Sequence, residues 1–414
     1  MNTPLPGAPL RIAVLGDFDG PHTRAWLRVF VERGHDVHAI SYYPPSAELP
    51  GVTLHVLSKR PPLPTQDLLS APHDPLSPGG ERGRRPSLTA TLRSAIPTSL
   101  LRYVHAWRYR RAGLRSLLDE IHPDVFHAHY AVEHGFYGAV GYHPYVVSAW
   151  GSDLLVDSYR GLNRRIARRA LLAADLVTGN DASLVKRAIE LGVPPERAAV
   201  VHLGIERLFL ETGVHSVNLQ TGDATPPTLI SYRALEPLYN VDVVLRAFRR
   251  VHEQVPAAQL VIAANGSASG SLASLAGELK PGTSVQFVGR KEQDWLARNL
   301  ATSQLYVSVP SSDSFALSNL EAMAAGAFPI VSNLPSVDGW IEHGVNGLRV
   351  PPRDVAALAA AIVQALDDPH LRRRAAIHNR QLVEARGLRE PNMLLMERHY
   401  YRLAGHPVEE RGGI

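Results

Sequence analysis

The sequence predicts an α/β protein made of two facing Rossmann-like domains, each built on a doubly wound parallel sheet. Three observations support this fold class. The chain has 414 residues, which suits two domains of about 200 residues better than one. Short runs rich in Val and Ile, bounded by Gly, Pro or Asp, alternate with helical patterns. The alternation stops in a polar stretch at residues 211–227 and then begins again, which indicates a second domain of similar build.

Buried parallel strands are expected where an apolar run is short and bounded by turn residues. In the first half of the chain these runs are Arg11–Leu15, Asp36–Ser41, Val52–Leu57, Asp124–Ala128, Tyr145–Ala149, Leu176–Thr178 and Ala199–His202. In the second half they are Thr228–Ser231, Gln259–Ala263, Ser284–Val288, Gln304–Val309 and Phe328–Ser332. Helices are expected between them, notably at Thr23–Arg33, Val241–Gln254, Gln293–Ala301 and Leu317–Ala325, and from Asp354 to Leu403.

The polar stretches suggest where the domains begin and end. We expect an N-terminal domain at residues 1–212, a linker at 213–227, a C-terminal domain at 228–388, and a final helix at 389–414 that packs back on the N-terminal domain. Residues 60–97 are dense in Pro, Gly and polar residues, which predicts a mobile insertion. Two facing domains of this class leave a cleft at the C-terminal ends of their strands, where ligands bind.

The composition is that of an ordinary globular protein, with 45% hydrophobic and 20% charged residues. No apolar run approaches the roughly 20 residues that cross a bilayer, and the N-terminus lacks the apolar core of a signal peptide. The lack of cysteine excludes disulfides and thiolate metal sites. We therefore expect a cytoplasmic protein. Its net charge of +4 permits anionic partners without choosing among them.

The densest group of chemically useful residues lies in the segment Ser311–Asn333. A strand is followed there by a loop of small residues and by a helix that begins near Leu317. The free N–H groups and the positive dipole end of such a helix favour a diphosphate. Asp313 lies in the loop and Glu321 lies eight residues later, so one carboxylate can meet sugar hydroxyls and the other a ribose. A second interpretation of Glu321 is equally open, because Ser318-x-x-Glu321 also fits a capping box.

This segment resembles the signature of the retaining glycosyltransferases of family four, which share the fold called GT-B. Their signature is an acidic residue, a short loop, and a glutamate eight positions later. The matching positions here are Asp313, Ser314, Phe315, Ala316, Leu317 and Glu321. The resemblance implies that Asp313 and Glu321 are catalytic-site residues and that the residues from Ser314 to Leu317 bind the donor. Asp313 replaces the more usual glutamate, which shortens its reach to the donor sugar by one methylene.

Other segments of the second half agree with the family in the same order. Arg233 matches an arginine that binds the donor diphosphate. The position of the family's lysine falls at Tyr239, so the usual second cation of this donor-binding segment is missing. Two further segments resemble those that line the nucleotide pocket, through Asn265, Gly266, Gly289 and Arg290. The resemblance covers nearly the whole chain apart from residues 60–97.

In the N-terminal domain the resemblance rests on strand ends. His129 matches a histidine that lies near the donor sugar in relatives, although a lone histidine is as often structural. Trp150 stands where many relatives have histidine, and Gly151 and Asp153 follow it at positions on the acceptor side. Gly20 lies in the first loop, which replaces a double-glycine turn that contacts the donor.

Two features leave metal and membrane binding to be considered. Asp17-Phe18-Asp19 is formally the D-x-D metal motif of a different glycosyltransferase fold, but it follows the first strand of a parallel-sheet domain, so we expect no metal site. Two arginine-rich helices are expected at Ser99–Leu118 and Leu162–Leu172. Each helix fits either a solvated helix face or peripheral contact with anionic lipid at the inner membrane face. Lipid contact would suit a lipid-linked acceptor.

The resemblance implies an enzyme that moves a sugar from a nucleotide diphosphate-sugar to a glycan, a lipid-linked acceptor or a small molecule, with retention of anomeric configuration. The nucleotide-sugar is a co-substrate, and no cofactor, metal or nucleic-acid partner is expected. A nucleotide-sugar epimerase of the same fold and a catalytically degenerate nucleotide-sugar-binding protein stay open as alternatives. An acceptor requirement separates transfer from epimerisation, and turnover separates both from a binding protein.

Overall fold

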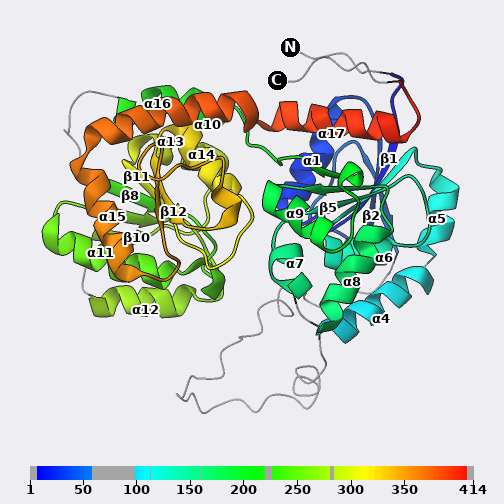
Figure 1. The fold of residues 1–414 in the computed structure, drawn as a ribbon, viewed down its shortest axis with the longest axis horizontal. Helices are drawn as coiled ribbons and strands as arrows, with labels where there is room; N and C mark the ends of the chain where they lie inside the picture. The colour runs from blue at the N-terminus through cyan, green and yellow to red at the C-terminus, as the bar shows by residue number, and fades with distance from the viewer. Residues whose placement is uncertain are drawn as a thin grey trace. The chain divides into compact units, whose positions relative to one another are not determined.

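The computed structural model describes residues 7–57, 98–111, 113–159, 161–219, 226–279 and 284–407 (Figure 1). The chain divides into two compact units. The first comprises residues 1–179, 185–199 and 398–414, and the second comprises residues 180–184 and 200–397. The insertion expected at residues 60–97 lies outside the described residues.

The described part of the first unit is built on a parallel sheet of seven strands. In spatial order these are β3 (Val52–Val56), β2 (Asp36–Ser41), β1 (Arg11–Leu15), β4 (Val125–His129), β5 (Tyr145–Ala149), β6 (Leu176–Gly179) and β7 (Ala198–Val200). Every strand expected in this half is present, with ends that differ by one or two residues. All residues of β4 and β5 are buried, as in a sheet covered on both faces.

The helices that connect these strands differ from expectation in one place. They are α1 (Pro21–Glu32), α4 (Thr98–Arg111), α5 (Leu114–Ile121), α6 (Phe136–Gly138), α7 (Ser152–Leu155), α8 (Gly161–Leu172) and α9 (Ala182–Glu190). The single helix expected over Ser99–Leu118 is wrong, because Gly113 adopts a φ of 85° and the helical path breaks there into α4 and α5. A short π-helix follows β4 at Tyr130–Gly135.

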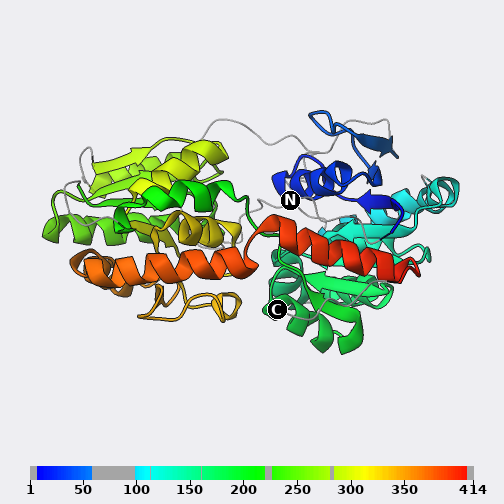
Figure 2. The same ribbon diagram turned by 90° about the horizontal axis from the view of Figure 1, so that it is seen from above.

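The last turns of α17 (Arg389–Leu403) belong to the first unit. The ring of Tyr400 lies 5.2 Å from that of Phe30 on α1, and its hydroxyl is hydrogen-bonded to Nδ1 of His127 at 2.6 Å. In both views this red end of α17 lies beside the blue α1 (Figures 1 and 2). The final helix therefore ends in the core of the first unit.

The described part of the second unit is built on a parallel sheet of six strands. Their order is β10 (Val285–Phe287), β9 (Gln259–Ile262), β8 (Thr228–Ser231), β11 (Leu305–Ser308), β12 (Phe328–Ser332) and β13 (Leu348–Val350). The five expected strands are present. The sequence does not predict β13, because three residues between Gly347 and Pro351 form too short an apolar run.

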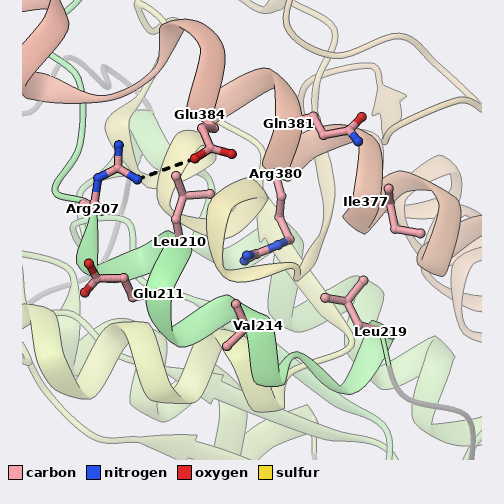
Figure 3. A pocket seen from close by; sticks show the side chains of 9 residues that line it. All are labelled: Arg207, Leu210, Glu211, Val214, Leu219, Ile377, Arg380, Gln381 and Glu384. Atoms are coloured by element: carbon pink, nitrogen blue, oxygen red, sulfur yellow. Dashed lines mark ion pairs between the residues drawn. The ribbon is translucent and has the colours of Figure 1, made fainter.

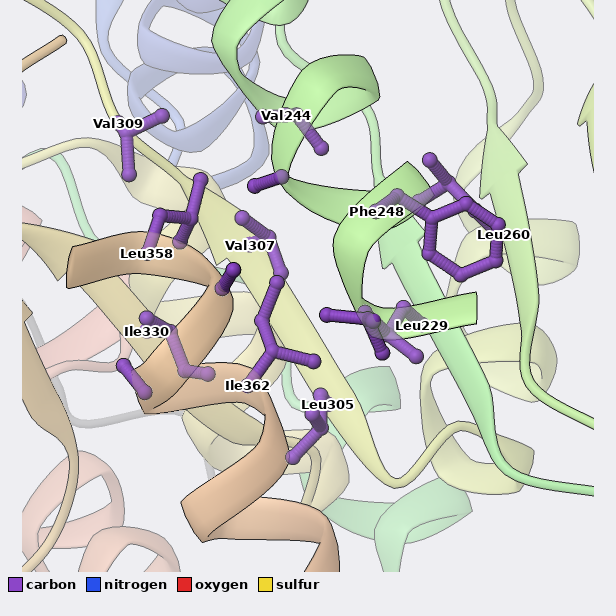
Figure 4. Packing of buried hydrophobic residues seen from close by; sticks show 14 of the residues in the cluster. Leu229, Val244, Phe248, Leu260, Leu305, Val307, Val309, Ile330, Leu358 and Ile362 are labelled. Atoms are coloured by element: carbon purple, nitrogen blue, oxygen red, sulfur yellow. The ribbon is translucent and has the colours of Figure 1, made fainter. Parts of the chain in front are cut away.

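Side chains of the second sheet alternate between two buried layers. Leu229, Val307 and Ile330 pack with one layer of helices (Figure 4), which contains α11 (Val241–Gln254), α12 (Ser269–Leu279) and α15 (Val355–Asp367). Ile230 and Tyr306 pack with the other layer, which contains α10 (Leu208–Thr212), α13 (Gln293–Thr302), α14 (Leu317–Ala325) and α16 (Pro369–Arg386). Helices on both faces of a parallel sheet give the doubly wound fold that the sequence predicts.

The chain that leads into the second sheet is packed. Phe209 of α10 is fully buried against α13 and α14, so this segment is part of the second unit. Asn218 donates its amide to the carbonyls of Gln304 and Gly326 at 2.8 and 2.9 Å. Residues 213–219 were expected in a linker because they are polar, but their polar groups satisfy backbone groups at the ends of neighbouring elements. Residues 220–225 of that linker lie outside the described residues.

Each sheet has one point at which the strand order reverses. It lies between β1 and β4 in the first unit and between β8 and β11 in the second. Ligands of open α/β sheets bind beyond the C-terminal ends of the strands at such a point. The residues that follow these four strands are therefore where function is expected.

Candidate active site

The reversal point of the second sheet carries a buried ion pair. Arg233 follows β8 and Asp313 follows β11, and Nη2 of the arginine lies 2.6 Å from Oδ2 of the aspartate. The two side chains are only 13% and 19% exposed. Nη1 of Arg233 donates to Oγ of Ser318 at 2.9 Å, and the ring centre of Tyr239 lies 4.4 Å from the guanidinium carbon. Three residues of the predicted donor site therefore come together at one point.

Glu321 lies on α14 and is held by a tyrosine. Its Oε2 accepts a hydrogen bond from the hydroxyl of Tyr232 at 2.9 Å, while Oε1 makes no hydrogen bond within the described part of the chain. The helix begins one residue before Ser318 and has no side-chain cap. The hydroxyl of Ser318 is engaged by Arg233 and Tyr306 instead. The capping-box interpretation of Glu321 is therefore wrong.

Burial and the ion pair together set the charges of this site. Burial raises the pKa of Asp313 and of Glu321, and nearby positive charge opposes the rise in both. Burial acts to lower the pKa of Arg233, but Asp313, Tyr306 and Tyr239 together outweigh it and raise the pKa, so the guanidinium stays charged. Nε of Arg233 is buried and has no hydrogen-bond partner among the described residues. A buried charged donor without an acceptor is costly, so Nε is a contact point for a ligand.

Helix α14 adds positive potential at the same place. It is nine residues long, and no side chain caps its N-terminus. Unpaired N–H groups and the helix dipole favour an anion at this end. Ser318 lies in the first turn and bonds Arg233, so a cation and a helix N-terminus act together. This combination suits a phosphate group.

Phe315 has a structural role that differs from the expected one. Its ring is 1% exposed and stacks on that of Trp340 with centroids 4.9 Å apart, so it cannot line a donor pocket in this conformation. Its N–H donates to Oδ2 of Asp181 at 3.0 Å, and its carbonyl accepts from the amide of Asn180 at 3.0 Å. Phe315 thus anchors the loop that carries Asp313. Asn180 and Asp181 are not among the residues predicted from the sequence, although a polar pair directly after an expected strand is a usable signal.

Glycines shape the neighbouring strand ends. A Cβ on Gly266 would lie 2.4 Å from the carbonyl oxygen of Leu235. The N–H of Leu235 donates to the carbonyl of Asn265 at 3.1 Å. Gly289 adopts a φ of 71°, which favours glycine. These predicted nucleotide-pocket residues hold the loop that follows β8, whereas Arg290 is exposed.

The reversal point of the first sheet carries an uncharged aromatic group around His129. This residue ends β4 and is 1% exposed, and neither ring nitrogen has a hydrogen-bond partner among the described residues. Its ring centre lies 5.1 Å from that of Trp26, 4.6 Å from that of His127 and 4.6 Å from that of Trp150. A Cβ on Gly16, which follows β1, would lie 3.8 Å from its Nδ1. Burial lowers its pKa well below the usual value, so the imidazole is neutral.

Asp153 supports this group and does not face a ligand. It is 0% exposed, and its carboxylate accepts the N–H groups of Ala131, Gly151 and Trp150 at 2.8, 2.9 and 3.3 Å. Burial raises its pKa to about 6. Because both carboxylate oxygens are already bound by backbone N–H groups, Asp153 has a structural role, in contrast to its expected place on the acceptor side. It fixes the loop that holds Trp150 against His129.

The first loop makes contacts of its own. Oδ1 of Asp17 accepts the N–H of Asp19 at 3.0 Å, and Oδ1 of Asp19 accepts the N–H of Ser46 at 2.7 Å. Gly20 precedes α1 with a φ of −68°, which any residue can adopt. Within the described residues, no three His, Asp or Glu side chains gather as metal ligands would.

A surface hollow of about 400 Å³ lies elsewhere in the second unit (Figure 3). Its lining comes from residues 207–219, which include α10, and from α16, and it includes Leu210, Arg380 and Glu384. Arg380 donates to the carbonyl of Ala324 near the C-terminal end of α14, whereas the ion pair adjoins the N-terminal end of that helix. No predicted site residue lines this hollow.

Two family models match the chain. Residues 20–204 match the glycosyl transferase 4-like domain, and residues 220–382 match the glycosyl transferases group 1. The chain belongs to the family-four glycosyltransferases of the GT-B fold. This glycosyltransferase is 27% identical over 287 residues to N-acetyl-α-D-glucosaminyl L-malate synthase of Bacillus anthracis, a match that covers 67% of the chain and 74% of the relative. It is 27% identical over 275 residues to D-inositol 3-phosphate glycosyltransferase of Thermobispora bispora, which covers 59% of the chain and 63% of the relative.

Solved structures share the fold of this glycosyltransferase. HepE of Anabaena, in a complex with UDP, has a TM-score of 0.71 at 16% identity and covers 95% of this chain and 100% of its own. Sucrose-phosphate synthase of Thermosynechococcus elongatus has a TM-score of 0.72 at 18% identity and covers 95% of this chain and 99% of its own. At these identities the likeness establishes the fold alone.

The arrangement of the arginine-rich helix α8 is compatible with both a solvent-exposed face and contact with anionic lipid. The helix buries Ile166 and Ala170 and exposes four arginines, Arg164, Arg165, Arg168 and Arg169. Both interpretations predict this arrangement, so membrane contact stays a prediction. Among the helices that the structure describes, none combines the length and the apolar character needed to cross a membrane.

Proposed function

We propose that this glycosyltransferase moves a sugar from a nucleoside diphosphate-sugar to a carbohydrate, lipid-linked or small-molecule acceptor, with retention of anomeric configuration. The observation that carries the proposal is the cluster of Arg233, Asp313, Ser318 and Glu321 at the reversal point of the second sheet. Structures of HepE contain UDP or UDP-glucose, which supports UDP-sugars as the first donors to test.

The diphosphate is the part of the donor that this cluster fits best. Arg233 is charged and buried, and its Nε has no acceptor in the described residues. Together with the uncapped N-terminus of α14, it would neutralise the negative charge that grows on the diphosphate as the glycosidic bond breaks. Fixed groups in a buried site do this without reorganising, which is why such a site accelerates departure of the leaving group.

The two carboxylates divide the remaining donor contacts. Oε2 of Glu321 is fixed by Tyr232, which leaves Oε1 to accept hydrogen bonds from ribose hydroxyls. Asp313, whose Oδ2 contacts Nη2 of Arg233, would accept hydrogen bonds from hydroxyls of the donor sugar. This assignment gives each carboxylate a neutral hydroxyl partner and leaves the diphosphate to the cation.

The first unit would contribute contacts to the sugars. A neutral imidazole carries one donor and one acceptor, and the two nitrogens of His129 have neither partner in the described residues. A sugar hydroxyl can supply both kinds of partner. Trp150, held by Asp153, offers an apolar ring face beside it. These features support a role in binding carbohydrate.

Without a covalent intermediate on the enzyme, retention requires the acceptor to attack from the same face from which the leaving group departs. The predicted site offers no obvious enzymic nucleophile, because Asp313 and Glu321 are assigned to hydroxyls. We therefore assign the role of base to the departing phosphate, whose developing negative charge can take the proton of the acceptor hydroxyl on the same face. An oxocarbenium-like transition state fits this route.

The test is product analysis by proton NMR at early times. UDP-, GDP- and ADP-sugars of α configuration are incubated with carbohydrate, lipid-linked and small-molecule acceptors. The proposal predicts an acceptor-dependent product whose anomeric coupling matches that of the donor. An inverted product would contradict retention. Release of free sugar or nucleotide without an acceptor would favour an epimerase or a hydrolase, and binding without turnover would favour a binding protein.

A further inference from the structure

We infer that Asp313 is an exchangeable internal ligand of Arg233, so that the donor site binds an intact nucleotide-sugar in preference to the free nucleoside diphosphate. This inference rests on the proposed function, since it assigns the diphosphate to Arg233. It adds a built-in discrimination against the nucleotide product.

The contacts of Arg233 show which of its donors are committed. Nη1 is taken by Oγ of Ser318 at 2.9 Å, and one face of the guanidinium is covered by Tyr239. Nη2 donates to a single oxygen of Asp313 at 2.6 Å, while the adjacent Nε is buried without a partner in the described residues. Asp313 thus contacts Nη2 and leaves the neighbouring Nε without an acceptor.

Nε and Nη2 lie on one edge of the guanidinium plane and point the same way. Two oxygens of one phosphate can meet both, in the bidentate arrangement that arginine favours. Phosphate binding on this edge would satisfy Nε, which Asp313 leaves unmet, but it brings a second anion to the nitrogen that holds Oδ2 of Asp313. Although Nη2 carries two N–H groups, the aspartate and the phosphate therefore compete for the same positive charge.

The displaced carboxylate needs a new partner. Asp313 is 19% exposed, so its charge would remain in a largely dry place once Arg233 turns to phosphate. A nucleotide-sugar offers sugar hydroxyls as donors for that carboxylate. A free nucleoside diphosphate offers none beyond the phosphate and adds negative charge beside it. The nucleotide-sugar therefore gives the Asp313 carboxylate new hydrogen-bond donors in place of Arg233, whereas the free nucleoside diphosphate does not.

Tyr239 makes this competition matter. The family resemblance expects lysine there, and a lysine would meet the diphosphate without passing through the ion pair. The tyrosine ring instead packs on Arg233 at 4.4 Å and supplies no charge. Phosphate binding then depends on taking Arg233 from Asp313.

The experiment compares affinities for UDP and UDP-glucose in the intact protein and in Asp313→Asn by isothermal titration calorimetry. The asparagine keeps the size of the side chain and removes the competing charge. UDP should bind the variant about tenfold more tightly, whereas UDP-glucose should bind no more tightly, so the preference for the intact donor collapses. Asp36→Asn is the matched control, because Asp36 pairs with Arg11 at 2.7 Å in the first unit, and it should change neither affinity.

The inference is overturned if Asp313→Asn leaves the affinity for UDP unchanged or weakens it, or if both ligands gain equally. Should that variant fail to fold, Tyr239→Lys tests the same competition, since an added cation should tighten UDP more than UDP-glucose; equal tightening would contradict the inference. If UDP and UDP-glucose do not bind the intact protein, the GDP and ADP pairs replace them. Failure of all three pairs contradicts the proposed function itself, whereas binding without the shift contradicts only the exchange.

Discussion

The two reversal points of this protein have the same topology and opposite chemistry. In the first unit, the ends of β1 and β4 bring Gly16 next to His129, inside a group of tryptophan and histidine rings. In the second unit, the ends of β8 and β11 bring Arg233 next to Asp313 in a buried ion pair. The sheet order fixes where a ligand can bind, and the residues after the strands decide what it is.

Under the proposed function, this difference in chemistry would give the two units different parts of the substrates to bind. A neutral aromatic group with unpaired imidazole nitrogens suits hydroxyls and apolar sugar faces. A buried cation at a helix N-terminus suits phosphate. Variants at the site of the second unit should therefore change nucleotide affinity. Variants at the site of the first unit should change turnover and leave nucleotide affinity unchanged.

The largest effect is expected at Arg233. Replacing it by alanine removes the cation that meets the diphosphate and leaves Asp313 buried without a partner. We expect kcat/KM to fall by about 10²- to 10³-fold and UDP affinity to fall with it. Steady-state kinetics and calorimetry measure both. Arg249→Ala, on the exposed face of α11, should change neither, and near-normal activity in Arg233→Ala would remove the residue from the site.

A smaller effect of a different kind is expected at His129. His129→Leu replaces a ring with two unpaired buried nitrogens by an apolar side chain, so the melting temperature should stay the same or rise by a few degrees. Transfer should fall by about 10- to 100-fold, because hydrogen bonds to the substrate are lost. UDP affinity should not change. A loss of UDP affinity as large as the loss of transfer would break the division between the units, and exposed His378→Leu serves as the control.

The first unit should also respond to acid. Burial lowers the pKa of His127 to about 3, below its unfolded value of about 6.5, so the unfolded chain binds the proton first as pH falls. This contribution to stability is fully present above about pH 6.5 and is lost toward pH 3, by at most about 1.4 kcal/mol per pH unit. His127→Gln cannot titrate, so its melting temperature should fall less steeply between about pH 7 and pH 5. Parallel curves for the two proteins would contradict this.

The smallest effect is expected at Tyr232. Tyr232→Phe removes the hydroxyl that fixes Oε2 of Glu321, a contact worth about 1 kcal/mol, so KM for the donor should rise by about three- to tenfold with little change in kcat. Tyr142→Phe, which loses a hydroxyl contact to the carbonyl of Pro123 in the first unit, is the control. An unchanged KM would mean that Glu321 does not bind the ribose.

The sequence predicts the sheets well because buried parallel strands leave a clear apolar pattern. It fails where one residue decides the path, as at Gly113, whose left-handed conformation splits the expected helix. It also fails for β13, where three residues lie between turns.

The candidate site was predicted in part. Arg233, Asp313 and Glu321 are expected from the family resemblance. Their contacts with Tyr232 and Ser318, and that of Ser318 with Tyr306, carry no local sequence pattern. Hydrogen bonding separates roles that sequence alone cannot. Phe315 and Asp153 occupy expected site positions, yet their polar groups are paired within the protein and hold loops, whereas the equally buried nitrogens of His129 have no partner among the described residues.

We propose that the strand ends of the second unit bind a nucleoside diphosphate through Arg233. Calorimetric titration of UDP, GDP and ADP into the intact protein and into Arg233→Ala tests this binding. We expect at least one nucleotide to bind the intact protein and the variant to lose at least about tenfold in affinity, which is about 1.4 kcal/mol. Binding of none of the three, or equal binding by both proteins, would contradict it.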